Sequence, residues 1–429
     1  MQSFLRTKGQ HPRRAAALGA ATAGVLLLAA CAGGGTPTPS GSAAGSEAPS
    51  DGATEVDTTF VVGTILPQTG NLGYLGPPEF AGVDLAAADL EAAGFEFEID
   101  VQHRDSGDTT TDIATASAGE LISAGADVVI GAASSGVSFT FIDQLIDAQV
   151  LQISPANTSP DFSDYEDDGF YWRTAPSDVL QGRVLGNLMT SDGAASVGFI
   201  TINDPYGTGL EENARMAVEA AGGTVTGSVL YNPGDTNFTS QVSEILAGEP
   251  DAIGILAFAE TAQIVPELVT QGFPASGMYF VDGNLSNSYN FPEGTLDGAK
   301  GTLPGNPADD TFRERLLEQD PNLQDFSYGP ESYDAVVLAA LAAATGGSAD
   351  SVTIRDNMQA VSEGGTKCTA VADCLQLLAD GEDIDYDGVS GPITFSDQGD
   401  PTEAYIGIYQ YGADNQYTFV RSEFGSLNE

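Results

Sequence analysis

Ser134 and Ser135 are the residues of this chain whose surroundings most resemble those of a catalytic nucleophile. They follow a short apolar segment, Asp127–Ile130, and stand in the segment AASSG at 132–136, ahead of a predicted helix. A serine on a sharp turn between a strand and a helix is typical of the nucleophile elbow of α/β hydrolases. Such a serine needs an imidazole to accept its proton. The only histidine after residue 30 is His103, which precedes the serine, whereas hydrolases place the histidine last. The sequence therefore argues against an enzyme.

A glycine-rich segment, GNLGYLG at 70–76, follows the first predicted strand. Its spacing is not the Gly-x-Gly-x-x-Gly of dinucleotide-binding loops, and that pattern alone would be weak evidence. The glycines do allow backbone N–H groups to approach a ligand at the start of a helix. We therefore expect this loop to contact a ligand other than a nucleotide.

Three loops carry small or polar residues directly after predicted parallel strands, at 70–76, 134–136 and 156–158. The carboxyl ends of such strands share one edge of an open sheet, where ligands bind. Hydroxyls and free N–H groups at helix starts suit a carboxylate. A single serine or threonine in this position more often caps its helix. The three loops together are better explained by a carboxylate site.

Short β-rich apolar segments alternate with Ala- and Leu-rich segments of helical spacing, such as Phe80–Ala93 and Gly209–Ala221. This alternation predicts an α/β fold with parallel sheets and crossover helices. The sequence shows a break at Tyr171–Ser177. The predicted strands are Thr59–Leu66, Phe95–Gln102, Asp127–Ile130, Val150–Ile153, Ser196–Ile202, Thr224–Tyr231, Ala252–Leu256 and Met278–Val281.

The C-terminal part of the chain changes character. Residues 308–380 are predicted to be mostly helical, and strands are predicted at Pro392–Phe395, Ala404–Tyr411 and Gln416–Arg421. The pair Asp414-Asn415 lies between the last two strands, as a hairpin turn requires. Two consecutive domains do not need these extra elements. We expect the chain to cross between two lobes more than once.

Acidic residues dominate the composition. Without residues 1–30 the chain holds ten Lys and Arg side chains against 61 Asp and Glu. Such a charge repels nucleic acid and anionic lipid head groups and disfavours nucleotide phosphates. We expect no nucleic-acid partner, and solubility is the simplest reason for the excess of acid.

The N-terminus has the features of an export signal. Arg13 and Arg14 precede an uncharged segment at 15–30 that ends in small residues. This segment is shorter than the ~20 residues of a membrane-spanning helix. The sequence LAAC at 28–31 resembles a bacterial lipobox, which predicts lipidation of Cys31; the alternative is an ordinary signal peptide with an incidental cysteine. We predict a signal peptide at 1–30 and a disordered Gly/Ser/Pro tether at 32–56.

Cys368 and Cys374 are the two remaining cysteines. An exported chain enters an oxidising compartment, which favours a disulfide between them. Closing so short a loop contributes about 2 kcal/mol. The alternative is metal binding, but no histidine lies nearby and the spacing is not that of a zinc site. We expect neither a metal nor a cofactor.

Four motifs carry a resemblance to a known family. They are ISPANTSP at 153–160, DPYGTG at 204–209, PGDTNF at 233–238 and DYDGVSGP at 385–392. In this order they resemble the extracytoplasmic solute-binding proteins of ABC-type importers, in the branched-chain (Leu/Ile/Val) amino acid-binding family. The resemblance extends from about residue 61 to residue 419.

The resemblance implies the type I periplasmic binding protein fold. This fold has two doubly wound parallel-sheet lobes joined by three hinge crossovers, which close over a ligand. It places lobe 1 at 57–175 plus 303–391, and lobe 2 at 176–302 plus 392–429.

The resemblance also implies a set of ligand-binding residues. Ser135 and Thr158 match the groups that hold the ligand carboxylate. The carbonyl of Ala156 and the side chain of Asp282 match those that meet the ammonium group, and Tyr206 lines the cleft. From the residues alone, Asp282 could equally be a cap or turn residue.

Neighbouring positions complete the predicted site. Ser134 and Asn157 belong to the same two loops. The family has a tyrosine in the glycine-rich loop where this chain has Leu75, with Tyr74 beside it. It has a second tyrosine near the position of Phe258, where this chain has none. These departures lie in the side-chain pocket, so the resemblance implies an amino acid without specifying leucine.

The function implied by the resemblance is that of a lipid-anchored substrate-binding component of an ABC-type importer. It would capture a small, branched-chain-like amino acid or related carboxylate by lobe closure and deliver it to permease subunits. We expect a monomer held outside the cell membrane by Cys31. The alternatives are a ligand-sensing receptor of the same fold with a membrane signalling partner, and an exported serine hydrolase using Ser134.

Overall fold

The computed structural model describes residues 58–427. The predicted signal peptide, Cys31 and the tether lie outside the described residues.

The first sheet has five parallel strands in the order β2-β1-β3-β4-β5. Its strands are β1 (Thr59–Leu66), β2 (Glu98–Asp105), β3 (Val128–Gly131), β4 (Leu151–Ser154) and β5 (Tyr171–Arg173). The bounds of β1 confirm the prediction. The prediction for β2 is three residues too early, because the apolar residues that precede the strand pack in the core without pairing. The expected break at Tyr171–Ser177 is wrong at its start, where three buried residues add an edge strand to β4.

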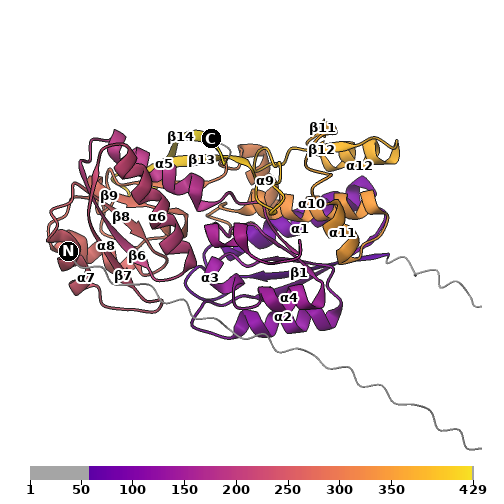
Figure 1. Ribbon diagram of the computed structural model, residues 1–429, viewed down its shortest axis with the longest axis horizontal. Helices are drawn as coiled ribbons and strands as arrows, with labels where there is room; N and C mark the ends of the chain where they lie inside the picture. The colour runs from indigo at the N-terminus through magenta and orange to yellow at the C-terminus, as the bar shows by residue number, and fades with distance from the viewer. Residues whose placement is uncertain (1–57, 428–429) are drawn as a thin grey trace, which may run out of the picture. The chain divides into compact units, whose positions relative to one another are not determined.

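Helices cover both faces of the first sheet. On one face α1 (Gly76–Ala93) packs with α10 (Gly329–Gly346), which is buried from Gly329 to Ala343 and consists of alanine, valine and leucine from Ala335 to Ala343. On the other face lie α2 (Ile113–Ala124) and α4 (Ile142–Ala148) (Figure 1). Apolar residues that alternate along β1 and β3 enter the two clusters in turn, which is why the sheet is doubly wound. The helices α9 (Asp310–Gln319), α11 (Ser351–Asn357) and α12 (Val371–Ala379) complete this first lobe.

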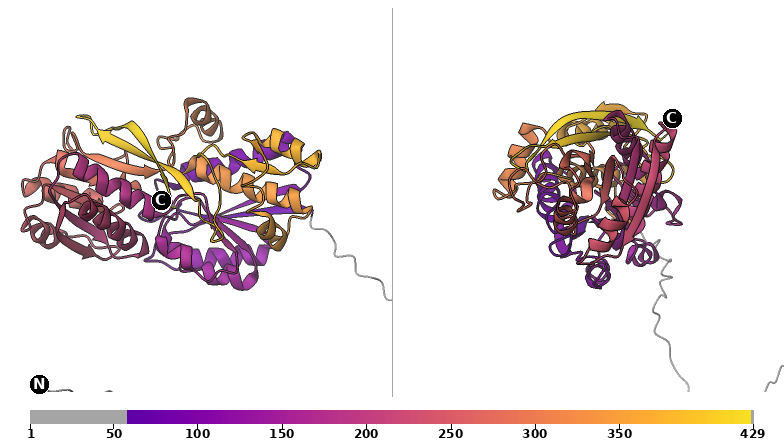
Figure 2. Two further views of the ribbon diagram at one scale, coloured as in Figure 1. Left: turned by 45° about the horizontal axis from the view of Figure 1, so that its top comes forward. Right: turned by 90° about the vertical axis from the view of Figure 1, so that its left-hand side faces the viewer.

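The second sheet has seven strands in the order β14-β13-β10-β9-β8-β6-β7. The parallel strands are β6 (Ser196–Ile202), β7 (Thr224–Tyr231), β8 (Ala252–Leu256), β9 (Met278–Phe280) and β10 (Lys300–Pro304). The sequence predicts the first four closely and misses β10. The hairpin of β13 (Glu403–Tyr411) and β14 (Tyr417–Ser426) pairs antiparallel with β10 and forms the outer edge of the sheet, in yellow in Figure 2.

Helices also flank the second sheet, which with them forms the second lobe. The helices α5 (Asp178–Ser191) and α6 (Pro205–Ala220) pack against each other on one side (Figure 1). The other pair, α7 (Thr239–Leu246) and α8 (Thr261–Thr270), lies on the opposite side. The predicted hairpin turn is confirmed, and Asn415 adopts a left-handed φ of 59° within it.

The chain passes between the two sheets three times. It crosses after β5, returns after β10 and crosses again before β13. The structure thus has two doubly wound lobes joined by three crossovers. The residue boundaries that the sequence assigns to the lobes stay a prediction.

The segment before the third crossover differs from the prediction at one point. Pro392–Phe395 is not a strand: only two isolated bridges join Pro392 to Asp387 and Phe395 to Pro401. The proline nitrogen cannot donate to a neighbouring strand, so a regular ladder does not form. Upstream, β11 (Thr366–Cys368) pairs with β12 (Ile384–Tyr386), and the Cys368–Cys374 disulfide fastens β11 to α12.

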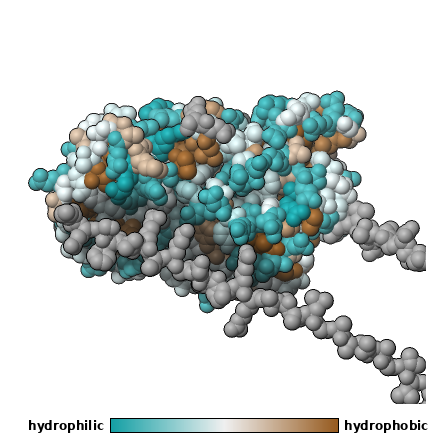
Figure 3. Space-filling model, viewed as in Figure 1, coloured by the Kyte–Doolittle hydropathy of each residue, from teal (hydrophilic) through white to brown (hydrophobic). Residues whose placement is uncertain are grey.

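The visible surface is predominantly hydrophilic, with separate hydrophobic patches (Figure 3). Over residues 58–427, no single helix has the length and apolar content to cross a membrane.

Candidate ligand-binding site

Loops from both lobes enclose one small cavity at the carboxyl ends of the parallel strands. The first lobe contributes the loops after β1, β3 and β4, and the second contributes those after β8 and β9 together with α6. About 10 Å³ is open to the centre of a water molecule, which is the space that one water needs. The residues lining it are Leu72, Leu75, Ala133, Ser134, Ser135, Ala156, Tyr206, Phe258, Asp282, Gly283 and Tyr328.

Asp282 is the most heavily bonded residue of this cavity. It begins a short turn of 3-10 helix, Asp282–Asn284, after β9, and it is 5% exposed. Its carboxylate accepts hydrogen bonds from the hydroxyls of Tyr206 and Tyr328, both at 2.7 Å, and from Nε2 of Gln181 at 2.9 Å. Burial raises its pKa, and the two tyrosines oppose that shift. Because Tyr328 belongs to the first lobe, Asp282 is a point at which the lobes meet.

A second tyrosine of the first lobe reaches the same turn. The hydroxyl of Tyr74 donates to the backbone carbonyl of Asp282 at 2.8 Å. Burial raises the pKa of Tyr74 well above its ordinary value, so this hydroxyl keeps its proton and remains a donor. Tyr74 therefore links the glycine-rich loop to the second lobe, although it does not line the small cavity itself.

Asp178 is a buried acid at the start of α5. Neither oxygen of its carboxyl group has a hydrogen-bond partner, although the residue is 0% exposed. Burial raises its pKa well above the ordinary value and the charge of Asp282 raises it further, whereas the neighbouring Thr158 side chain and the charge of Arg173 lower it. The backbone N–H of Asp178 donates to the carbonyl of Thr158 at 2.7 Å, which places this acid against a predicted ligand loop. A buried carboxyl group without donors is costly, and a bound cation would remove that cost.

The loop after β4 presents one free hydroxyl. Oγ1 of Thr158 is buried and has no hydrogen-bond partner. By contrast, Oγ of Ser135 accepts from the N–H of Ser159 at 3.3 Å, which joins this loop to the start of α3 (Ser135–Ser138). The structure thus brings the two predicted carboxylate-binding residues together.

Asn157 has a supporting position. Its amide group donates to the carbonyls of Ala132 and Ala133 at 2.9 and 3.0 Å and accepts from the hydroxyl of Tyr171 at 3.0 Å. These bonds hold the loop after β4 against the loop after β3. Asn157 does not line the cavity, so the structure shows it as a link between the two loops.

Ser134 lines the cavity and also caps α3. Its Oγ accepts from the N–H of Val137 at 3.4 Å. Ala156 lines the cavity beside it. Ser134 therefore caps a helix, as the alternative interpretation expected, and also lines the cavity.

An apolar wall faces these polar groups. Leu72 and Leu75 come from the glycine-rich loop, and Phe258 stacks on Tyr206 with ring centroids 5.3 Å apart. Leu72, Leu75 and Ala156 belong to the same hydrophobic cluster as the core of the second lobe, so the wall continues across the lobe boundary.

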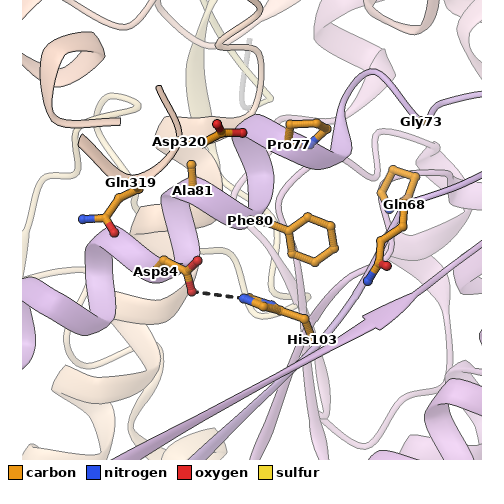
Figure 4. Close-up of a pocket in the computed structure, with 10 residues that line it drawn as sticks. Gln68, Gly73, Pro77, Phe80, Ala81, Asp84, His103, Gln319 and Asp320 are labelled. Carbon is orange, nitrogen blue, oxygen red and sulfur yellow. Dashed lines mark hydrogen bonds and ion pairs between the residues drawn. The ribbon is translucent and has the colours of Figure 1, made fainter. Parts of the chain in front are cut away.

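His103 lies at a different cavity, of about 430 Å³, beside α1 (Figure 4). Its Nε2 lies 3.0 Å from Asp84 and its Nδ1 lies 3.0 Å from the hydroxyl of Thr64. The hydroxyl of Ser134 is bonded elsewhere, as a helix cap. The imidazole and the serine are not brought together.

The sequence interpretation missed Asp178, Gln181, Tyr328 and Leu72. Asp178 and Gln181 lie in the first turns of α5. An acid at the start of a helix is usually explained by its favourable interaction with the helix dipole, so the sequence offers no reason to assign Asp178 to a site. Tyr328 reaches the site through a left-handed backbone, φ 59°, that its sequence does not signal. Only the position of Asp178 directly after the first crossover could have suggested its role.

A family model described as "Periplasmic binding protein" matches residues 59–415. The chain belongs to this family. It is 24% identical over 314 residues to Leu/Ile/Val-binding protein homolog 1 of Brucella abortus, covering 69% of this chain and 76% of the relative.

Solved periplasmic binding proteins share the fold. The leucine-binding protein LivK of Thermotoga maritima superposes with a TM-score of 0.69 at 21% identity, covering 85% of this chain and 98% of its own. A solute-binding protein of an ABC transporter from R. palustris, in complex with benzoate, superposes with a TM-score of 0.68 at 17% identity, covering 86% of this chain and 97% of its own. These structures support the type I periplasmic binding protein fold, and the second shows that the fold also accommodates a ligand without an amino group.

Proposed function

We propose that this periplasmic binding protein captures a small α-amino acid between its lobes and delivers it to a membrane importer. The observation that carries the proposal is the buried pair of carboxyl groups, Asp178 and Asp282. Each shifts toward its neutral form, and Asp178 has no hydrogen-bond donor. A ligand ammonium group would supply hydrogen-bond donors and add to the positive charge of Arg173, which already lowers the pKa of Asp178.

Hydroxyl groups of the loops around the cavity suit the ligand carboxylate. Ser134 and Ser135 line the cavity, and the Thr158 hydroxyl next to it is buried without a partner. The carbonyl of Ala156 would accept a further ammonium hydrogen. The apolar wall of Leu72, Leu75 and Phe258 would favour an aliphatic ligand side chain over a charged one.

Ligand capture in this proposal is a change in lobe spacing. With the lobes in contact, the cavity has room for one water, so the lobes must separate before an amino acid can enter. The ligand-bound cavity must be wider than in this structure, and Tyr74 and Tyr328 of the first lobe would then close beside the Asp282 turn on the ligand. The ligand shifts the population toward the closed state, and no covalent bond is made.

The test is calorimetric titration of the purified protein with glycine, alanine, valine, leucine and isoleucine. We expect at least one to bind, and Asp282→Asn or Asp178→Asn to weaken that binding by about 30-fold or more, since truncating one partner of a buried charge pair costs 2–5 kcal/mol. Asp112→Asn, at an exposed side chain, is the matched control. Binding that survives both buried substitutions would show that these acids do not hold an ammonium group.

We propose that Cys31 anchors the protein outside the cell membrane. The support is the lipobox-like sequence LAAC at 28–31. Metabolic labelling with a fatty-acid probe should mark the wild-type protein and not Cys31→Ser, and the substituted protein should leave the membrane fraction. The partner would be the permease subunits of an ABC-type importer, with a signalling receptor as the alternative. Co-purification from detergent would tell these partners apart.

A further inference from the structure

Arg313, on α9, is exceptional among the basic side chains of this acidic protein. Residues 58–427 contain ten Lys and Arg, and eight of them form ion pairs with Asp or Glu. A ninth, Arg183, donates to the backbone carbonyl of Ser426. Arg313 has neither an ion pair nor a side-chain hydrogen bond within the described part of the chain. Its Nε is buried without an acceptor, and its guanidinium group stacks over the ring of Phe326 at 5.4 Å.

The Arg313 side chain lines a cavity of about 350 Å³ that is distinct from the cleft between the ligand loops. The cavity lies where the crossover after β10 meets the β13–β14 hairpin, and it is lined by Ser327 and by the aromatic residues Tyr409, Tyr417 and Phe419. Tyr328 is the one residue that lines both this cavity and the cleft. This volume is typical of a small-molecule site.

The acids of the cavity do not neutralise Arg313. Asp325 accepts hydrogen bonds from the N–H of Ser327 at 2.8 Å and from the hydroxyl of Tyr417 at 3.4 Å, so its carboxyl group is already engaged. Burial raises the pKa of Glu331, which also lines the cavity, to about 8. At neutral pH Glu331 is therefore largely protonated and can donate a hydrogen bond. The cavity thus offers a guanidinium group, a protonated carboxyl group and hydroxyls, beside apolar and aromatic surface.

We propose that this hinge cavity is a second ligand site, which binds a small monocarboxylate at Arg313. The planar fork of a guanidinium group matches the two oxygens of a carboxylate, and its buried Nε lacks such an acceptor. A single carboxylate suits one unpaired cation. The aromatic lining favours an apolar or aromatic body on the ligand. This site does not depend on the amino acid proposed for the cleft.

The test uses 4-fluorobenzoate as the probe, with its ¹⁹F NMR line observed as purified protein is added. We expect binding to the wild-type protein, with affinity reduced at least tenfold in Arg313→Gln and less in Arg313→Lys, which keeps the charge but loses the fork. Arg183→Gln is the matched control and should bind like the wild type. Inorganic phosphate should compete poorly.

Two further variants separate the hinge cavity from the cleft. Thr418→Trp narrows the hinge cavity at an exposed lining residue without touching Arg313, so it should also block the probe. Ser135→Ala changes the cleft and should leave probe binding unchanged. The proposal is overturned if the wild-type protein does not bind 4-fluorobenzoate, if Arg313→Gln binds it equally, or if only Ser135→Ala weakens it. Thr418→Trp keeps the test decisive should Arg313→Gln fail to fold.

Discussion

Glu331 shows how one side chain can make the stability of this protein depend on pH. It lies in the first turn of α10 and is 2% exposed. Its neighbours with titratable groups include Glu79 on α1, Asp334 on its own helix, and the tyrosines Tyr328 and Tyr409. A Cβ placed on Gly305 of the second crossover would lie 2.1 Å from its carboxyl oxygen. No cation is paired with Glu331 among the described residues. Burial and the charge of Asp334 therefore favour its protonated form.

Glu331→Gln should remove part of this pH dependence. The pKa of Glu331 is raised from its ordinary value of 4.5 to about 8, so the folded protein holds a proton that the unfolded chain releases between these pH values. The wild type should lose stability relative to Glu331→Gln as pH rises through this range, by up to about 5 kcal/mol. Below pH 4.5 the protonation of Glu331 should make little difference between the two proteins.

Urea denaturation at a series of pH values from 4 to 9 measures this effect. Glu96→Gln, at an exposed side chain, serves as the control and should run parallel to the wild type. Parallel curves for Glu331→Gln as well would mean that Glu331 ionises in the folded protein as freely as in the unfolded chain.

At the scale of elements, α10 holds the loop that precedes the third crossover. The carboxylate of Asp334 accepts from the Tyr386 hydroxyl at 2.7 Å, from the N–H groups of Val389 and Ser390 at 3.0 and 2.8 Å, and from the Ser390 hydroxyl at 2.6 Å. The motif at 385–392 is therefore shaped by a single acid on a distant helix. Its glycine at 388 is required because a Cβ there would lie 2.2 Å from the same carboxylate.

Asp334→Asn should destabilise the folded protein by about 2–4 kcal/mol, since an amide turns an NH₂ group toward donors and leaves buried groups unpaired. Ser390→Ala removes one donor and should cost about 1 kcal/mol. Chemical denaturation at pH 8 measures both, because burial raises the pKa of Asp334 to about 6 and the carboxylate is then ionised. Equal losses in the two variants would show that Asp334 does not organise the loop as a whole.

At the scale of the whole molecule, one buried ion pair joins two of the three crossovers. Arg173, at the end of β5, lies 2.6 Å from Asp400, just before β13, and the two side chains are 0% and 4% exposed. Arg173 also donates to the carbonyls of Asn157 and Ser159 at 3.3 and 2.7 Å. The ligand loop after β4 is thereby tied to the segments on which the lobes would turn.

Arg173→Gln should cost about 3–5 kcal/mol of stability, because Asp400 would remain buried without its counter-ion. It should also weaken ligand binding, since Asn157 and Ser159 flank Thr158. The matched control is Arg104→Gln, which breaks an exposed pair with Glu120 and should cost about 0–1 kcal/mol. Thermal unfolding and ligand titration provide the two measurements. A variant with normal stability but weaker binding would assign Arg173 to the ligand loop alone.

The sequence alone predicted those strands that are long enough to show a clear run or alternation of apolar residues. The bounds of β1, β6 and β7 follow from continuous or alternating β-branched residues, and they match the structure. The three-residue β5 and the strand β10, which ends in Pro304, carry too little pattern to be recognised. Both exist because a neighbouring strand supplies their hydrogen bonds.

The candidate site divides in the same way. Ser135, Ala156 and Thr158 follow strands of the first sheet, so chain order and the shared edge of a parallel sheet were enough to bring them together. Tyr206 and Asp282 belong to the second sheet, and only the family resemblance predicted that they join the same site. Their ligand remains a prediction.

Only the tertiary structure decided which groups would be left without partners. The tyrosines that bond to Asp282 come from positions 46 to 208 residues away in the chain. The carboxyl group of Asp178 and the guanidinium group of Arg313 are left without hydrogen-bond partners within the described chain by the way distant segments pack. Local sequence determines periodicity and turn chemistry because these act between near neighbours. Burial and charge pairing act between residues that are close in space but can be far apart in the chain. The sequence around an acid or arginine therefore does not show whether the fold pairs it or leaves it free to bind a ligand.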